Sequence, residues 1–158
     1  MQTPDIHWLE LKVPPPLIAV LLGAFIWWLS FWLPTSLALP FDTLYLALPV
    51  ALLGLSCDLA GILSFYRAQT TVNPLKPGST RALVISGIYS YTRNPMYLGL
   101  TCLLTAWVLY LGQWLLLPLV GLLVFYLNRF QIAPEEQALL RLFGDQYSAY
   151  QQRVRRWL

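Results

Sequence analysis

The longest stretch of the chain without a charged residue, residues 94–128, is NPMYLGLTCLLTAWVLYLGQWLLLPLVGLLVFYLN. As one straight helix its 35 residues would be about 52 Å long, whereas the hydrocarbon core of a bilayer is about 30 Å thick. A polar, glycine-containing interruption, Leu111-Gly112-Gln113, lies near its middle. We therefore predict a hairpin of two membrane crossings, residues 96–110 and 114–127.

Two more apolar stretches precede this hairpin. The first, residues 17–33, is followed by Pro34, and the second, residues 44–66, contains Asp58 as its only charged residue. The whole chain is 58% hydrophobic and 11% charged, against about 25% charged in soluble domains, which excludes disorder and an ordinary soluble globule. The sequence thus predicts an all-α integral membrane protein, a single domain of residues 1–158 with four transmembrane helices.

The basic residues indicate the orientation of the four crossings. All ten Lys and Arg fall in the N-terminal tail, in residues 67–95 or after residue 127, which four crossings place on one side, while the opposite turns hold only Asp42. By the positive-inside rule that side is cytoplasmic, and we expect a bacterial inner membrane protein. The basic residues form no dense stripe that could follow phosphates, so nucleic acid is not an expected partner.

Most polar chemistry lies in two cytoplasmic segments. Residues 67–95 contain prolines and glycines that exclude one long helix, and their aromatic and basic side chains favour a packed loop that lines a site. The second segment, residues 134–158, begins with proline and two carboxylates, which suit a helix start. Gly144-Asp145 is predicted to divide it into two helices, with Asp145 as a cap. Glu136 falls on the apolar stripe of this region, so it needs a partner.

A family resemblance rests on these two segments. Residues 86–99, SGIYSYTRNPMYLG, are followed about 40 residues later by Glu135-Glu136 and then by the ending VRRWL at 154–158. Together they resemble the membrane methyltransferases that include isoprenylcysteine carboxyl methyltransferases and phospholipid N-methyltransferases. The resemblance covers residues 67–158. Isoprenylcysteine enzymes generally have His where this chain has Asn94, a departure that weakens the implication of a prenylcysteine substrate but not that of methyl transfer. An isoprenylcysteine-like carboxylate, a phospholipid amine and another small lipophile stay open as acceptors.

The resemblance implies an S-adenosylmethionine-dependent transferase with a cytoplasmic cofactor pocket and a lipophilic acceptor, a small molecule or lipid, that arrives from the bilayer. It implies Arg93 and Glu136 as catalytic residues and no metal. The cofactor-binding positions that it implies are Gly87, Ile88, Tyr89, Arg93, Asn94, Pro95, Met96, Tyr97, Leu98, Glu135 and Glu136.

The residue types suit this chemistry independently of the resemblance. Aromatic faces accommodate a sulfonium cation, an arginine can bind a carboxylate through two parallel hydrogen bonds, and carboxylates accept hydrogen bonds from ammonium or hydroxyl groups. Methyl transfer is an in-line displacement, which needs positioning and exclusion of water more than acid–base machinery. The lone histidine, His7, is expected to be incidental.

Several alternatives stay open at this stage. Arg93 can pair with Glu135 or Glu136 as a structural lock, and Tyr147 and Tyr150 can pack against the loop instead of contacting a ligand. Asp58 either lines the inner acceptor cavity or pairs with an arginine, because an ionisable group at that depth faces protein or a polar cavity. The competing functions are a small four-helix exporter that uses Asp58, a membrane reductase that uses NADPH, and a non-catalytic scaffold. The acceptor atom and the oligomeric state are not defined by the sequence.

Overall fold

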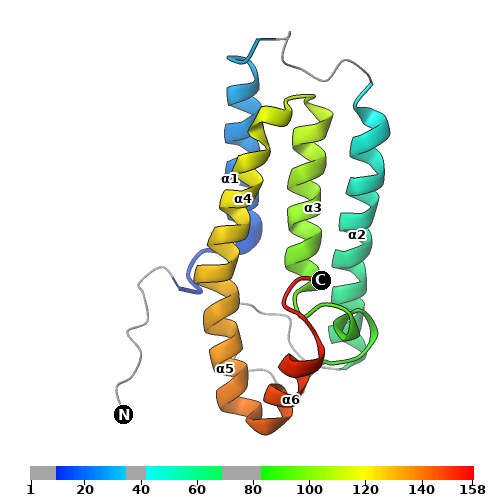
Figure 1. Cartoon of the computed structure of the whole chain (residues 1–158), viewed down its shortest axis with the longest axis vertical. Helices are drawn as coiled ribbons and strands as arrows, with labels where there is room; N and C mark the ends of the chain where they lie inside the picture. The colour runs from blue at the N-terminus through cyan, green and yellow to red at the C-terminus, as the bar shows by residue number, and fades with distance from the viewer. Residues whose placement is uncertain (1–9, 35–41, 69–82) are drawn as a thin grey trace.

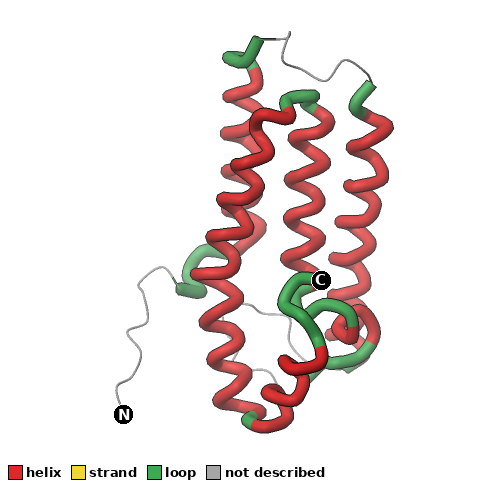
Figure 2. The backbone as a smooth tube through the Cα atoms, viewed as in Figure 1, coloured by secondary structure: helices red, strands yellow, loops and turns green. Residues whose placement is uncertain are grey.

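The computed structural model describes residues 10–34, 42–68 and 83–158 of the chain. These residues form helices and no strand, which confirms the all-α prediction (Figure 2). His7 and part of the predicted 67–95 loop, residues 69–82, lie outside the described residues. In Figure 1 the helical columns that contain α1, α2, α3 and α4 run side by side, and α5 and α6 extend past one end of them. The α-helices are α1 (Pro15–Ser30), α2 (Leu44–Arg67), α3 (Pro95–Tyr110), α4 (Leu117–Tyr126), α5 (Ala133–Phe143) and α6 (Asp145–Arg153).

The predicted hairpin turn is confirmed. α3 ends at Tyr110, and Gly112 has a φ of +69°, a backbone conformation that glycine adopts without steric cost. A short 3₁₀ helix, η4 (Trp114–Leu116), then starts the return helix. Prolines in the first turns of α1 and α3 fit their positions, because the first N–H groups of a helix have no partner within it.

The helix that contains the last predicted crossing does not end at residue 127. A π-helical segment, η5 (Leu127–Ile132), joins α4 to α5, so one continuous helix runs from Trp114 to Phe143. Residues 127–143 contain no glycine that could end the helix. Pro134 has no N–H for the carbonyl of Phe130, four residues earlier, and the backbone N–H of Leu11 donates to that carbonyl at 3.1 Å instead.

The segment before α1 packs on η5 through two more contacts. Glu10 forms an ion pair with Arg129 at 2.6 Å, and the side-chain amide of Gln131 donates to the carbonyl of Val13 at 2.8 Å. Leu11 adopts a φ of +57°, which is unusual for a residue with a side chain. The N-terminal segment therefore holds the π-helical segment directly before the carboxylates of α5.

The predicted division after residue 143 is confirmed, but not the predicted cap. Gly144 has a φ of +50° and separates α5 from α6. Asp145 is the first residue of α6 and makes no capping hydrogen bond with its side chain, because Gly144 occupies the cap position. The turn therefore depends on the backbone freedom of glycine instead of a side-chain cap.

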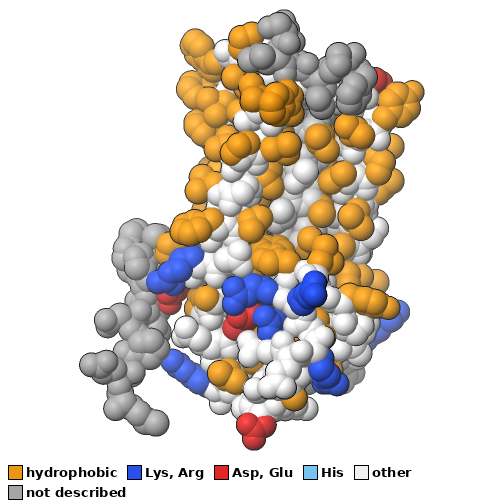
Figure 3. All heavy atoms as spheres, in the orientation of Figure 1, with side chains coloured by type: hydrophobic (Ala, Val, Ile, Leu, Met, Phe, Trp, Pro, Cys, Tyr) orange, Lys and Arg blue, Asp and Glu red, His pale blue; other side chains and the backbone are white. Residues whose placement is uncertain are grey.

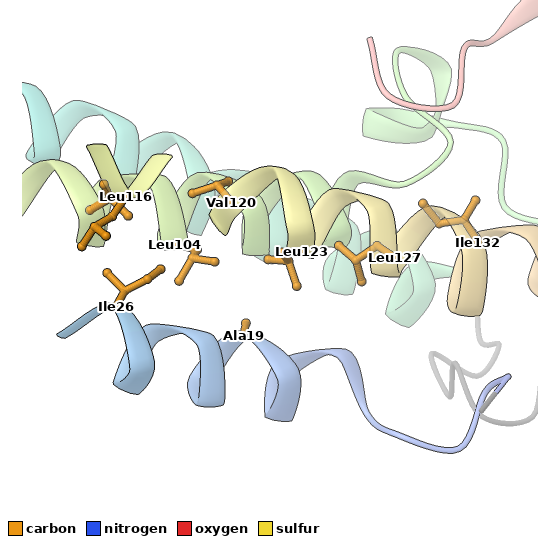
Figure 4. Close-up of a cluster of buried hydrophobic side chains, with 9 residues drawn as sticks. Ala19, Ile26, Leu104, Leu116, Val120, Leu123, Leu127 and Ile132 are labelled. Carbon is orange, nitrogen blue, oxygen red and sulfur yellow. The ribbon is translucent and has the colours of Figure 1, made fainter. Parts of the chain in front are cut away.

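Apolar packing and apolar surface dominate the four columns. α1, α3 and α4 share a core whose labelled side chains are Ala19, Ile26, Leu104, Leu116, Val120, Leu123, Leu127 and Ile132 (Figure 4). Large apolar side chains also cover the outside of the columns, while the Lys and Arg side chains on the face shown in Figure 3 gather toward the end that carries α5 and α6. Two helices, Leu44–Arg67 and Trp114–Phe143, are long and apolar enough to cross a membrane, and α1 and α3 are shorter apolar helices of 16 residues each.

α2 packs against α3 through glycines. A Cβ atom added at Gly54 would lie 2.8 Å from the carbonyl oxygen of Gly99, and one added at Gly61 would lie 2.7 Å from the side chain of Met96. A Cβ atom at Gly99 would collide with the carboxylate of Asp58. The two backbones approach so closely that residues larger than glycine do not fit, and this contact fixes the start of α3.

Candidate functional site

The residues implied by the resemblance gather where α2 ends and α3 begins. Gly87 opens a 3₁₀ turn, η3 (Gly87–Ser90), with a φ of +66°. A Cβ atom at Gly87 would lie 3.2 Å from the hydroxyl oxygen of Ser64 on α2, so the loop passes close to the end of that helix. Glycine is suited to this position by both its backbone conformation and its small size.

Tyr89 is buried within η3. Its ring packs edge-on against Phe65 of α2, with ring centroids 5.4 Å apart, and its carbonyl accepts a hydrogen bond from the hydroxyl of Tyr150 at 2.7 Å. Burial, with smaller effects of Tyr150 and Glu135, raises the pKa of the Tyr89 phenol. Tyr89 is therefore a neutral aromatic surface at physiological pH.

α6 supports this loop with two buried tyrosines, Tyr147 and Tyr150. Burial raises the pKa of Tyr150 to about 12, and the nearby charge of Arg93 opposes that shift. Both rings belong to a small core that also includes Leu83, Ile85, Leu139, Phe143 and Val154. Of the two alternatives considered for these tyrosines, the structure displays packing against the loop.

Glu136 has two arginine partners. Its Oε1 atom lies 3.0 Å from Nη2 of Arg93, and Nε and Nη2 of Arg156 donate to Oε1 and Oε2 at 3.2 and 2.5 Å. The side chains of Arg93 and Glu136 are each 12% exposed, while that of Arg156 is 39% exposed. Glu136 thus has the partner that its place on the apolar stripe requires, and the anticipated pairing with Arg93 is present.

The C-terminal tail crosses over the loop that carries Arg93. The backbone N–H of Arg93 donates to the carbonyl of Arg155 at 3.0 Å, and the side chains of Thr92 and Asn94 donate to the carbonyl of Arg156 at 3.3 and 3.0 Å. The indole N–H of Trp157 donates to the side chain of Asn128 at 3.1 Å. The tail is therefore an integral part of this cluster.

Sequence reasoning missed Arg156, Trp157 and Asn128 as parts of the site. Basic residues and a tryptophan at the end of a chain are also typical of interfacial helices, so their presence alone does not indicate these contacts. The signal that could have identified Arg156 and Trp157 is the ending VRRWL, which is part of the family resemblance.

Glu135 has different surroundings from its neighbour. Its Oε1 accepts a hydrogen bond from the hydroxyl of Tyr97, which comes from the first turn of α3. Among the described residues no Lys or Arg lies within ion-pair distance of Glu135. Two adjacent carboxylates therefore have contrasting partners, two arginines for Glu136 and a phenol for Glu135.

The other residues that the resemblance implies shape the backbone of the site. Asn94 precedes α3 and Pro95 is its first residue, while Met96 faces Gly61 of α2. The carbonyl of Ile88 accepts from the backbone N–H of Tyr91, which closes the η3 turn. Leu98 follows on α3 and is partly buried. Asp58 is partly buried in the α2–α3 contact, and no ion pair joins it to an arginine of the described residues.

Comparisons with known proteins identify the family. The family model described as phospholipid methyltransferase matches residues 42–146, about two thirds of the chain, and the chain belongs to this family. An uncharacterized protein of Haemophilus influenzae is 51% identical over 65 residues, which are 40% of this chain and all of that protein. The protein-S-isoprenylcysteine O-methyltransferase of Schizosaccharomyces pombe is 32% identical over 79 residues, which are 50% of this chain and 34% of that enzyme.

These matches confirm the resemblance found in the sequence. The matched region runs from the residues just before α2 to the start of α6, so it includes residues 86–99 and Glu135-Glu136 but not the ending at 154–158. The apolar helices and the family together identify a membrane protein of the methyltransferase type. The match to the yeast enzyme spans about a third of that enzyme's length.

Proposed function

We propose that the protein transfers the methyl group of S-adenosylmethionine to a lipophilic acceptor that partitions into the membrane. The family and the name of the yeast relative support methyl transfer. The observation that carries the proposal is the unequal pairing of the adjacent carboxylates Glu135 and Glu136 at the polar end of the apolar helices.

The charges of the site match the amino acid end of this cofactor. Arg93 and Arg156 share the one carboxylate of Glu136, which leaves one positive charge in this trio without a counter-charge. The buried Nε atom of Arg93 has no hydrogen-bond partner among the described residues. A buried donor of this kind is costly unless a ligand accepts from it. We assign Arg93 to the carboxylate of the cofactor.

Glu135 supplies the complementary carboxyl group for the ammonium end of the cofactor. Its carboxylate accepts from Tyr97 and has no cation beside it in the described part of the chain. The ammonium group of the cofactor would satisfy this carboxylate. We therefore assign Glu135 to the ammonium and Glu136 to holding the arginine.

Two neutral tyrosines complete the proposed pocket. Tyr89 and Tyr97 come from η3 and α3 and both lie near Glu135. Aromatic faces next to a carboxylate stabilise a cation, so these rings suit the sulfonium centre. When bound, S-adenosylmethionine supplies a methyl group on a positively charged sulfur, and methyl transfer leaves that sulfur as a neutral thioether.

The apolar helices provide the other half of the proposed reaction site. The acceptor reaches the pocket from the bilayer along their outer surfaces, and the aromatic side chains exclude water from the reacting atoms. We propose Asp58 as a residue of the inner acceptor cavity. We propose that Arg93 contacts the cofactor directly as a catalytic residue and that Glu136, the other residue implied as catalytic, acts by orienting Arg93.

The proposed reaction requires a defined orientation in the membrane. We propose that α1, α2, α3 and the helix from Trp114 all span the bilayer as one domain. The N-terminus, residues 67–95 and the C-terminus then face the cytoplasm of a bacterial cell, where S-adenosylmethionine is available. The basic residues at this end follow the positive-inside rule.

Calorimetric titration of the protein in detergent tests the cofactor. We expect S-adenosylmethionine and S-adenosylhomocysteine to bind and NADPH not to bind. Arg93→Ala should weaken binding by about tenfold or more, the loss expected for one charge-assisted contact. Arg141→Ala, which removes an exposed arginine from α5, is the matched control and should bind as the wild type does. Binding of NADPH alone would support a reductase, and the absence of any binding would overturn the proposed function.

A further inference from the structure

The two arginines on Glu136 hold it in different ways. Arg156 contacts both carboxylate oxygens, through Nε and Nη2, whereas Arg93 contacts one oxygen through Nη2 alone. A two-point contact between guanidinium and carboxylate fixes orientation more strongly than a single contact does. Glu136 is therefore oriented mainly by Arg156, and Arg93 keeps donors available.

The backbone around Arg156 strengthens this difference. The carbonyl of Arg156 accepts from Asn94 and Thr92, and that of Arg155 accepts from the backbone N–H of Arg93. Trp157 then anchors the tail to Asn128 on the π-helical segment η5. Arg156 is thus fixed to the loop by its backbone and to α5 by its side chain.

We propose that Arg156 is a positioning residue, which holds Glu136 so that Arg93 can direct its remaining donors into the cofactor site. This inference rests on the proposed function and deepens it. Without Arg156, both oxygens of Glu136 would be available to Arg93, and the ion pair would compete with the cofactor carboxylate for the same guanidinium. Arg156 therefore acts through Glu136 and Arg93 and does not contact the cofactor.

The first test compares cofactor affinity in two matched variants. Arg156→Ala should raise the Kd of S-adenosylmethionine by about tenfold, as expected when one charge-assisted contact is lost. Arg156→Lys keeps the charge but not the two-point geometry, so it should restore only part of the affinity. Arg153→Ala removes an exposed arginine of the same region, which bonds only to the backbone of its own helix, and should leave the Kd unchanged.

The second test is a double-mutant cycle with Glu136→Gln. If Arg156 acts through Glu136, Arg156→Ala should have little further effect on the Kd in the Glu136→Gln background. A full additional loss of affinity there would show that Arg156 binds the cofactor itself and would overturn the proposal. An unchanged Kd in Arg156→Ala alone, with a lower Tm, would reduce Arg156 to a structural residue.

A third measurement does not depend on the cofactor. Thermal unfolding of the same four proteins without ligand should show coupling between Arg156 and Glu136, because each single change leaves the other charge without this partner. Coupling without cofactor binding by the wild type would mean that the ion pair exists and that the proposed function fails. The absence of coupling would contradict the positioning role whatever the wild type binds.

Discussion

The α2–α3 contact and the charged cluster around Glu135 and Glu136 are both close contacts, but different kinds of residue form them. Glycines at positions 54, 61 and 99 remove side chains so that two backbones can meet. In the cluster, long side chains from α3, α5, the preceding loop and the tail meet around Glu135 and Glu136. The first contact leaves no room for an added atom, whereas the second depends on which charged side chains are paired.

This difference suggests that the glycine contact mainly stabilises the fold, whereas the charged cluster mainly serves function. The glycine contact holds α3 in place, and α3 starts directly after Arg93 and Asn94. The cluster adds little apolar burial, yet it contains the buried donor that we assign to the cofactor. We therefore expect changes in the glycine contact to affect folding and changes in the cluster to affect binding and turnover.

The largest expected effect is that of Gly99→Ala. Its new methyl group would collide with Asp58 and lie 2.7 Å from the carbonyl oxygen of Gly54, so the backbones must move apart. We expect a loss of about 3 kcal/mol in stability, the upper part of the range for overpacked sites, and a fall of roughly 6 to 12 °C in Tm. Thermal unfolding in detergent measures both.

Gly121→Ala on α4 is the matched control for this change. A Cβ atom at Gly121 meets no other atom within 4 Å, so alanine should be neutral or slightly stabilising in that helix. Asp58→Ala should restore only part of the stability of Gly99→Ala, because the carbonyl of Gly54 remains in place. Equal Tm values for Gly99→Ala and Gly121→Ala would contradict the close approach of α2 and α3.

The next effect concerns the charged cluster. Arg93→Ala and Glu136→Ala should each lower turnover by about tenfold or more, the expected result of losing one charge-assisted contact of about 1.5–3 kcal/mol. Both proteins should still be obtained in folded form, because α2 and α3 remain in contact. Methyl transfer assays on the purified variants measure the loss, and near-normal rates in both would refute the assignment of these site residues.

A smaller effect is expected at Asp58, which belongs to the glycine contact but is proposed to face the acceptor. Asp58→Asn keeps the shape of the side chain and removes its charge. We expect the KM for the acceptor to rise several-fold while the Kd of the cofactor stays the same, as for the loss of about 1 kcal/mol of acceptor binding. Asp58→Leu with normal expression and normal turnover would exclude both roles considered for this residue.

The smallest effect is expected at the ion pair between Glu10 and Arg129. The side chain of Arg129 is 48% exposed, and exposed ion pairs contribute about 0–1 kcal/mol. Glu10→Gln should therefore lower the Tm by no more than roughly 4 °C and leave cofactor binding within twofold of the wild type. A loss of binding as large as that of Arg93→Ala would mean that the N-terminal segment sets the position of α5.

Apolar pattern and turn residues predicted most of the fold. The helices at 44–67 and 95–110 and the turn at Gly112 follow from long apolar stretches with few or no charges and, in the second case, a local glycine, which are strong local signals. The sequence did not predict that one helix continues from Trp114 to Phe143, because the polar residues Asn128 and Arg129 and then Pro134 suggested a boundary between two helices. The contact between Leu11 and Phe130, which satisfies the carbonyl opposite Pro134, joins distant parts of the chain and leaves no local pattern.

The candidate site was predicted in part for the same reason. Arg93 and the two adjacent glutamates were identified from their place in two recognisable segments, and Glu136 was expected to need a partner. The sequence could not predict that Glu136, and not Glu135, pairs with the arginines, nor that Arg156 is one of them. Both facts depend on which side chains meet across three separate elements. The sequence alone does not distinguish two adjacent glutamates; the positions of the surrounding charged side chains do.

Transfer of a labelled methyl group tests the central claim most directly. The purified protein would be incubated with methyl-labelled S-adenosylmethionine and a bacterial membrane lipid extract, and the label that enters the organic phase would be counted. We expect organic-phase label with the wild type, at least tenfold less with Arg93→Ala, and wild-type amounts with Arg141→Ala. Label that stays in the aqueous phase with the wild type, or equal transfer by Arg93→Ala, would contradict methyl transfer at this site.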